Sequence, residues 1–152
     1  MTFDIRPALV ADLDTVVDIT RRAYDVYLPI LGYPPVPVTE DYAPRIARGE
    51  VWLGLEDGAI AALIVIERDV DHDMIFSVAV DPDHAGYGYG RRLIDFAEER
   101  ARDAGRATIR LYTNALMTRN IALYKRLGFE ETGRRPNPKR PVFTIVDMTK
   151  RL

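Results

Sequence analysis

Residues 80–92 read VDPDHAGYGYGRR and follow an apolar run, Met74–Val80, whose length and flanks predict a buried strand. Three glycines stand at alternate positions in this stretch, at Gly86, Gly88 and Gly90. A helix is predicted from about Gly90 to Ala104, because its apolar residues recur every three or four positions. A buried strand, a glycine-rich turn and a helix therefore follow one another.

This order of elements favours an anionic ligand at the turn. Glycines allow successive backbone N–H groups to converge without side chains in the way. The start of a helix adds unpaired N–H groups and a partial positive charge, and Arg91 and Arg92 supply countercharge. Together these features suit a pyrophosphate; a glycine-rich connector without a ligand is the structural alternative.

Two common phosphate-binding patterns do not fit the turn. A P-loop would end in Gly-Lys-Ser or Gly-Lys-Thr, and the turn contains no lysine. A dinucleotide fingerprint counted from Gly86 requires glycine where Arg91 stands, and one counted from Gly88 requires glycine where Leu93 stands. The local pattern alone thus leaves several phosphate ligands open.

The segments before the turn predict helices and a hairpin. Residues 12–27 carry apolar side chains at helical spacing, and Pro29 is expected to end that helix. Residues 28–38 hold four prolines and a glycine, which predicts a structured loop, and a short helix follows to about Arg48. The pair Asp57-Gly58 between two strand-like runs is a strong hairpin signal.

The complete order of predicted elements is β-α-α-β-β-β-α-β-α-β-β, with residues 68–73 as a charged turn. The strand, helix and strand at 74–113 imply a parallel pair with a right-handed crossover, and the hairpins imply antiparallel neighbours. A chain of 152 residues has room for one core. The prediction is a single-domain α/β fold with a mixed sheet and helices on both faces.

Composition excludes several classes of function. The net charge of −2 comes from 21 basic and 23 acidic residues, which gives no support to nucleic-acid binding. The absence of cysteine removes disulfides, thiolate metal sites and a cysteine nucleophile. The N-terminus lacks a signal-peptide pattern, and no apolar run approaches the ~20 residues that span a bilayer. We expect a soluble cytoplasmic protein with no membrane contact.

Three segments together resemble the GNAT-type (GCN5-related) N-acetyltransferase superfamily. They are VAVDPDHAGYGYGRRLI (78–94), LYTN (111–114) and MTRNIALYKRLGFEETGR (117–134). The order of elements agrees over essentially the whole chain, so the resemblance implies one N-acetyltransferase domain covering residues 1–152. It also implies a mostly antiparallel sheet of about seven strands, with a central parallel pair splayed for coenzyme A.

The resemblance implies a role for individual positions. Val78 and Val80 would pair through their backbones with the pantetheine arm of acetyl-CoA, and Asn114 and Asn120 would contact the cofactor. Tyr124 would act near the thioester sulfur as the general acid, and the Val78 N–H would stabilise the thioester oxygen. The pyrophosphate would lie on the backbone N–H groups of the turn, namely Ala85, Gly86, Tyr87, Gly88, Tyr89, Gly90 and Arg91. The family usually has Gln or Arg at the position of Ala85, so one phosphate contact is expected to be missing.

The implied reaction is direct transfer of an acetyl group to a primary amine of a small molecule or peptide. An amine of pKa ~10.4 is neutral in only about one molecule in a few thousand at pH 7, so a proton acceptor is required. The strand Met74–Val80 contains no carboxylate, and Phe76 and Ser77 stand where one would be sought. The nearby candidates are expected to be solvated turn residues or helix caps, and water can relay the proton equally well. These candidates are Glu40, Asp41, His72 and Asp73.

The acceptor side is predicted less directly. Tyr27, Tyr33 and Tyr42 alternate with prolines and would form an aromatic wall for the amine, or else a cover over the sheet. His72 and His84 are isolated, so no metal is expected. An aromatic loop and exposed closing strands are compatible with a homodimer. Besides an enzyme, two alternatives stay open: a non-catalytic coenzyme A-binding sensor or interaction module, and a binder of another nucleotide.

Overall fold

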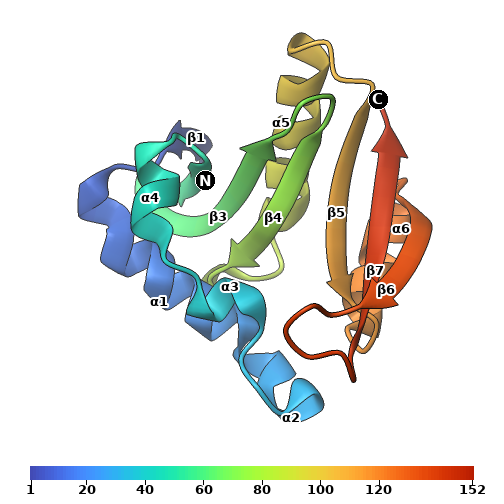
Figure 1. Cartoon of the computed structure of the whole chain (residues 1–152). Coiled ribbons are helices and arrows are strands. Elements are labelled where there is room, and N and C mark those ends of the chain that lie inside the picture. Colours follow the sequence, from blue (N-terminus) through green and yellow to red (C-terminus); the bar gives the residue numbers. More distant parts are fainter. The chain divides into compact units, whose positions relative to one another are not determined.

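The computed structural model describes all residues of the chain, Met1–Leu152. Figure 1 shows the helices and strands with their labels. In chain order they are β1 (Phe3–Pro7), α1 (Leu13–Tyr24), α2 (Leu28–Leu31), α3 (Val36–Thr39), α4 (Tyr42–Ala47), β2 (Val51–Glu56), β3 (Ala59–Arg68), β4 (Asp73–Val80), α5 (Tyr89–Asp103), β5 (Thr108–Asn114), α6 (Thr118–Arg126), β6 (Glu130–Pro136) and β7 (Thr144–Arg151). Short 3-10 turns occur at Val10–Asp12, Asp25–Tyr27 and Pro82–His84.

The sheet has seven strands in the order β1-β2-β3-β4-β5-β7-β6. Strands β4 and β5 are parallel and pair at Asp73↔Ile109 through Ile75↔Leu111. The pairs β1–β2, β2–β3, β5–β7 and β6–β7 are antiparallel. This arrangement confirms the predicted α/β class with a mostly antiparallel sheet of about seven strands.

The chain divides into two compact units. Unit 1 comprises residues 1–67 and 76–97, and unit 2 comprises residues 68–75 and 98–152. Each unit is held by its own buried side chains.

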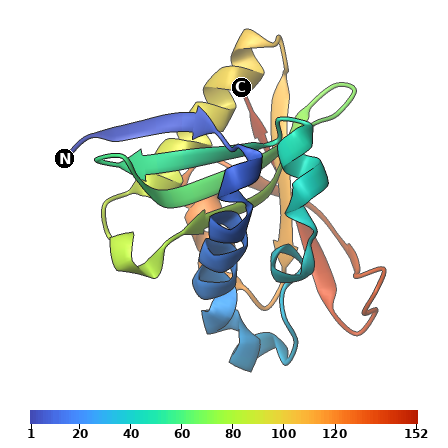
Figure 2. The ribbon, with the colours of Figure 1, turned by 90° about the vertical axis from the view of Figure 1, so that its left-hand side faces the viewer.

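Strands β1, β2 and β3 of unit 1 pair with one another in antiparallel orientation (Figure 2). The turn between β2 and β3 uses Asp57 at φ 48° and Gly58 at φ 87°, which confirms the predicted Asp-Gly hairpin. Asp57 also accepts a hydrogen bond from the Thr2 backbone N–H at 2.8 Å. On β2, a Cβ added to Gly54 would lie 2.4 Å from the Phe3 ring, so this glycine lets Phe3 lie across the strand.

Helices α1 and α5 pack on opposite sides of strands β2 and β3 in unit 1 (Figures 1 and 2). The amphipathic helix α1 buries Val16 and Ile19, as its spacing predicted. From the other side, Phe96 of α5 contacts Trp52 with ring centroids 5.0 Å apart. The glycine-rich turn thus leads from β4 into a helix that is anchored on the sheet.

The proline-rich segment 28–38 was predicted to be a loop, and that prediction is wrong. It contains α2 and α3, each a single helical turn with a proline in its first turn, where a missing N–H removes no helical hydrogen bond. Gly32 at φ 77° ends α2. The preceding helix α1 already ends at Tyr24, not at Pro29.

Helix α4 begins directly after an aspartate cap. Asp41 is its N-cap, and the Asp41 side chain accepts a hydrogen bond from the Ala43 backbone N–H at 3.2 Å. An aspartate at this position satisfies a backbone donor that has no partner within the helix.

Strands β5, β7 and β6 of unit 2 lie side by side, with α6 beside them (Figure 1). The ring of Tyr124 on α6 contacts that of Phe129, which directly precedes β6. Lys150 of β7 donates to the Leu127 carbonyl at 2.7 Å and pairs with Glu98 at 2.8 Å. The core of unit 2 contains buried apolar residues of β5, of β7 and of the segment after α6. These residues are Ile109, Leu111, Phe129, Val146 and Met148.

The predicted charged turn 68–73 is one residue shorter at each end in the structure. Arg68 belongs to β3 and Asp73 to β4, and Asp73 is fully buried. The Asp73 carboxylate accepts hydrogen bonds from Arg68 at 3.2 Å and lies 3.4 Å from Nε of Arg106. Asp73 is therefore a structural ion-pair partner in unit 2, not a solvated turn residue.

None of the helices combines the length and apolar character needed to cross a membrane.

Candidate functional site

The entry to the glycine-rich turn is fixed by Asp81, directly after β4. Its carboxylate accepts hydrogen bonds from both terminal nitrogens of Arg22, at 2.7 and 2.8 Å, and from the Asp83 backbone N–H at 2.9 Å. The Arg22 hydrogen bonds hold the pKa of Asp81 below its usual range. Since Arg22 lies on α1, this two-pronged ion pair ties the turn to a helix 59 residues away in sequence.

The turn itself presents open backbone. Residues 85–88 are all exposed, and Gly86 and Gly88 have φ values of 90° and 77°. A Cβ added at either glycine would meet no atom within 4 Å. The left-handed backbone, not crowding, therefore demands glycine here, and the space above the turn is free for a ligand. This geometry fits a pyrophosphate group held by backbone N–H groups.

Helix α5 begins directly after the turn, and its first residue is anchored. Tyr89 is buried, and its ring stacks on Phe3 with centroids 4.3 Å apart. The Tyr89 hydroxyl donates to Glu56 at 2.7 Å, and burial together with this carboxylate raises the pKa of Tyr89 to about 12. The first N–H groups of α5 have no partner within the helix, so they point toward the exposed turn from a rigid base.

Glu56 holds a second residue of this region. Its other carboxylate oxygen lies 2.5 Å from Nδ1 of His84, which immediately precedes the turn. Glu56 stands at the end of β2, so one carboxylate connects the hairpin to residues on either side of Gly86 and Gly88. We refer to Glu56, His84 and Tyr89 as the Glu56 clamp.

The end of β4 lies close to the helix start. A Cβ on Gly90 would lie 3.5 Å from the Val80 side chain and 3.8 Å from that of Val78, which is ordinary contact distance. The Val78 carbonyl accepts a hydrogen bond from the Tyr24 hydroxyl at 3.2 Å. Unit 1 therefore brings together Val78, Val80 and the turn residues 85–91 that the sequence named.

Unit 2 contains the other predicted cofactor residues. Asn120 and Tyr124 are four residues apart on α6 and so share a helix face. Tyr124 is 9% exposed, and its ring meets Phe129 edge-on at 5.9 Å. Asn114 ends β5, and its side-chain oxygen accepts from the Leu116 N–H at 2.9 Å, which shapes the connection to α6.

The acidic and basic candidates for the proton acceptor are all engaged. Glu40 pairs with Arg45 at 2.7 Å, and Asp41 caps α4. His72 is almost buried, with Nδ1 2.7 Å from Asp71, and Asp73 is held by two arginines. His72 is therefore not the solvated turn residue that was one expectation for it, and its contact with Asp71 gives it a structural place in unit 2.

Phe76 and Ser77, the positions on β4 at which a carboxylate was sought, differ in their contacts. The guanidinium of Arg45 lies 3.8 Å over the Phe76 ring, where it makes a cation–π contact. The Ser77 hydroxyl is buried without a hydrogen-bond partner. Neither side chain offers a ready acceptor for a proton.

The three tyrosines proposed for an acceptor wall differ in exposure. Tyr27 and Tyr33 are half-buried, but Tyr42 is 1% exposed and its hydroxyl donates to the Pro37 carbonyl at 2.5 Å. Burial raises the pKa of Tyr42 to about 12, and the nearby hydroxyls of Ser77 and Thr20 act in the opposite direction. The structure thus places Tyr42 in the core of unit 1.

No group of three or more histidine, aspartate or glutamate side chains is arranged to hold a metal ion. His84 is bound to Glu56, and His72 to Asp71.

Sequence reasoning did not identify Arg22, Asp81 or Glu56 as supports of the turn. One signal was present for Asp81, because an aspartate directly before proline is a common helix start, and it caps the short turn Pro82–His84. No local signal marks Arg22 or Glu56, since their partners are distant in sequence.

Comparison with known proteins identifies the family. The sequence profile of the Acetyltransferase (GNAT) family matches residues 13–129. The [Ribosomal protein bS18]-alanine N-acetyltransferase of Escherichia coli (strain K12) is 34% identical over 93 residues, which are 59% of this chain and 63% of the relative. Mycothiol acetyltransferase of Cellulomonas flavigena is 37% identical over 84 residues, 55% of this chain and 24% of the relative. The matched region thus spans less than two thirds of these curated relatives.

Solved structures of similar fold agree with this. The crystal structure of the ribosomal-protein-S18-alanine N-acetyltransferase from Escherichia coli aligns with a TM-score of 0.76 and 26% identity, covering 99% of this chain and 94% of that one. The PaiA N-acetyltransferase from Thermoplasma acidophilum, solved in complex with coenzyme A, aligns with a TM-score of 0.84 and 17% identity over 100% of both chains. The family profile covers most of the sequence, which confirms the resemblance inferred from residues 78–134. The chain therefore belongs to the acetyltransferase (GNAT) family.

Proposed function

We propose that this chain is an acetyl-CoA-dependent N-acetyltransferase that transfers an acetyl group directly to a primary amine of a small molecule or peptide. The observation that carries the proposal is the exposed turn of residues 85–88, with two left-handed glycines and open space above them, between β4 and the start of α5. Relatives in the family are named for such activities, on a ribosomal protein in one case. We further propose that residues 1–152 act as one N-acetyltransferase domain.

Unit 1 would hold the pyrophosphate of acetyl-CoA. The backbone N–H groups from Ala85 to Arg91 are the proposed donors, and the partial positive charge at the start of α5 adds to them. Arg91 is exposed and supplies a countercharge. The Asp81–Arg22 ion pair and the Glu56 clamp fix both ends of the turn, so little ordering entropy is lost on binding.

The backbone of β4 would hold the pantetheine arm and the reacting carbonyl. The proposed contacts are the backbone groups of Val78 and Val80, and the N–H of Val78 would donate to the thioester oxygen as charge develops there. The Val78 carbonyl, in the next peptide group along β4, accepts a hydrogen bond from the Tyr24 hydroxyl, which supports a fixed backbone conformation at Val78.

The side chains of α6 would complete the chemistry. Acetyl-CoA supplies an activated acyl group as a thioester. The amine nitrogen forms a bond to the acyl carbon, the carbon–sulfur bond breaks, and Tyr124 donates a proton to the departing sulfur. Asn120 and Asn114 would contact the cofactor arm. With no cysteine in the chain, transfer without a covalent acyl-enzyme is favoured.

The proton of the attacking amine would leave through water. The candidate side chains are held in ion pairs, a helix cap or buried contacts, so none is available as a strong acceptor without breaking those interactions. This observation also keeps a coenzyme A-binding sensor without catalysis as the second candidate function.

A turnover assay separates these functions. The chain is incubated with acetyl-CoA and a panel of small and peptide amines, and free thiol release is recorded while mass spectrometry detects acetylated product. Thiol release that depends on the amine supports the enzyme. Coenzyme A binding by calorimetry without any turnover across the panel supports the sensor, and stabilisation by ATP or NAD alone contradicts both.

Two finer points belong to the proposal. We propose that the protein acts in the cytoplasm, which cell fractionation can test. We propose a homodimer as well, and sedimentation analysis at micromolar concentration would show a single-chain mass if that is wrong.

A further inference from the structure

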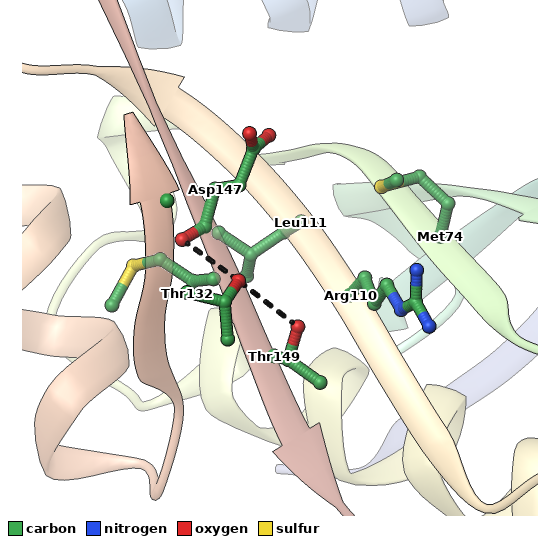
Figure 3. A pocket seen from close by; sticks show the side chains of 8 residues that line it. Met74, Arg110, Leu111, Thr132, Asp147 and Thr149 are labelled. Carbon is green, nitrogen blue, oxygen red and sulfur yellow. Dashed lines mark hydrogen bonds between the residues drawn. The ribbon is translucent and has the colours of Figure 1, made fainter. Parts of the chain in front are cut away.

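A cavity of about 330 Å³ lies in unit 2, on the face of the sheet formed by β5, β7 and β6 together with the start of β4 (Figure 3). Its lining combines one arginine, one carboxylate and two hydroxyls with apolar side chains. The lining residues are Met74, Arg110, Leu111, Thr132, Gly133, Asp147, Met148 and Thr149. Its volume is at the low end for a small-molecule site, so it suits a ligand of a few heavy atoms.

The strand register explains how this lining forms. Met74 stands opposite Arg110 on β5, and Arg110 stands opposite Thr149 on β7, so these three side chains form one row across the sheet. In the next row, Asp147 stands opposite Gly133 of the edge strand β6. Arg110 and Met74 lie side by side in Figure 3.

Gly133 keeps one side of the cavity open. A Cβ added at this position would meet no atom within 4 Å, and Gly133 does not need the left-handed backbone that favours glycine. The backbone of β6 at Gly133 can therefore carry a larger side chain without strain. Such a side chain would fill the part of the cavity next to Asp147.

The electrostatics of the cavity leave one positive charge without a direct partner. Nε of Arg110 is buried and has no hydrogen-bond partner. Its charge acts on Asp71, but that carboxylate is hydrogen-bonded to Nδ1 of His72 at 2.7 Å. Asp147 in turn is held by Arg135 through two contacts, at 2.9 and 3.2 Å, so its negative charge is already balanced.

The two threonine hydroxyls are weakly engaged. Thr132 Oγ1 donates to the Asp147 carbonyl at 3.3 Å and lies 3.3 Å from Thr149 Oγ1 (Figure 3). Both distances are long for hydroxyl hydrogen bonds, so the Thr149 hydroxyl can turn to another acceptor at little cost. The row of Arg110 and Thr149 thus offers a guanidinium and a hydroxyl to the same ligand group.

We propose that this cavity binds the carboxylate of a small organic acid. Arg110 forms a two-pronged charge-assisted pair with the carboxylate, because the guanidinium geometry matches its two oxygens. Thr149 donates a third hydrogen bond, and Met74, which stands in the same row as Arg110, contacts a short apolar stem. The site consists of residues of unit 2 alone and does not depend on the proposed function.

Binding is tested first without any reaction. The full chain without acetyl-CoA is titrated with butyrate, and the Arg110 side-chain N–H signal and the backbone amides of Thr132 and Thr149 are followed by NMR. We expect saturable shifts at these positions. Arg110→Gln should weaken binding roughly 10- to 100-fold, the effect of losing a charged hydrogen-bond partner.

A second variant guards against an effect on folding. Gly133→Ile fills the cavity from β6 without touching Arg110, and it should also abolish the shifts while the spectrum stays dispersed. The matched control is Arg151→Gln, an exposed arginine on β7 outside the cavity, which should bind butyrate like the unmodified chain. Butyrate shifts that survive both cavity variants would overturn the proposal, as would tighter binding of inorganic phosphate than of butyrate.

The carboxylate bound by Arg110 can be part of the acceptor amine or part of a separate ligand. A matched pair of amines, with and without a carboxylate, distinguishes these two cases. If it belongs to the acceptor, which rests on the proposed function, 4-aminobutyrate has a lower KM than butylamine and Arg110→Gln removes the difference. If it belongs to a separate ligand, the two amines have equal KM values and butyrate still binds through Arg110. Either result supports the site, and loss of all turnover leaves the NMR result unaffected.

Discussion

Gly88 provides the sharpest test of the glycine-rich turn, because a matched glycine exists elsewhere in unit 1. Gly88 has φ 77° and Gly49 has φ 74°, and a Cβ added at either position would meet no atom within 4 Å. Alanine at either site therefore causes the same local penalty, that of a left-handed backbone, which is about 1–2 kcal/mol. Steric clashes add nothing at either site.

The two variants should thus lose similar stability and differ in coenzyme A binding. We expect Gly88→Ala and Gly49→Ala each to lower Tm by roughly 2–8 °C, the shift that this energy gives for a chain of such length. Gly88→Ala should also weaken coenzyme A binding about 10-fold or more, because its methyl group intrudes on a backbone that donates charge-assisted hydrogen bonds. Gly49→Ala lies outside the turn and should bind normally.

Stability is measured by thermal denaturation without ligand, and the dissociation constant of coenzyme A by calorimetry well below both Tm values. Equal affinity of the two variants for coenzyme A would refute the assignment of the pyrophosphate to this turn. Unequal losses of stability would refute the strain argument and leave the comparison of affinities without its control.

Three further changes probe the reaction and the two units. Tyr124→Phe should lower kcat about 100-fold or more while KM for acetyl-CoA changes little, since a general acid contributes this much; unchanged kcat in steady-state assays would exclude that role. Burial raises the pKa of Tyr42 to about 12, above the value of about 10 in the unfolded chain. The buried neutral phenol therefore contributes its full stabilisation of the fold below about pH 10, and this contribution is lost as pH rises through about 12. Tyr42→Phe should therefore flatten the decline of unfolding free energy over that window in urea titrations, and an unchanged slope would argue against it. Asp73→Asn should cost about 1.5–3 kcal/mol in unfolding free energy because it removes the charge from a fully buried carboxylate that accepts from Arg68 and pairs with Arg106, whereas Asp69→Asn, at an exposed site, should cost under about 0.5 kcal/mol.

Many elements could be predicted because their signals are local. The hairpin at Asp57-Gly58 follows from two residues that tolerate positive φ, and the cap of α4 from one aspartate before a helical segment. The glycine-rich turn follows from the succession of a buried strand, three glycines and a helix. Each of these depends on neighbours in sequence, so the chain itself carries the information.

Other features depended on packing and were not predictable. The proline-rich segment 28–38 folds into two single-turn helices, too short to be stable alone, and only contacts with the rest of unit 1 hold them. Tyr42 was expected in an aromatic wall for the amine or in a cover over the sheet, and it lies in the core of unit 1. Its position is decided by where α4 lies on its neighbours, which spacing along the chain does not report.

For this protein the sequence alone indicated the class of fold and the position of the glycine-rich turn, since these rest on periodicity and turn chemistry, and it indicated the family through the resemblance of residues 78–134. The tertiary structure decided what supports and surrounds them. Arg22 meets Asp81 and Glu56 meets His84 across 59 and 28 residues, and Arg110 lines a cavity because Gly133 stands in register beside Asp147. Such contacts join side chains whose spacing carries no periodic signal, so only the packed strands and helices reveal them.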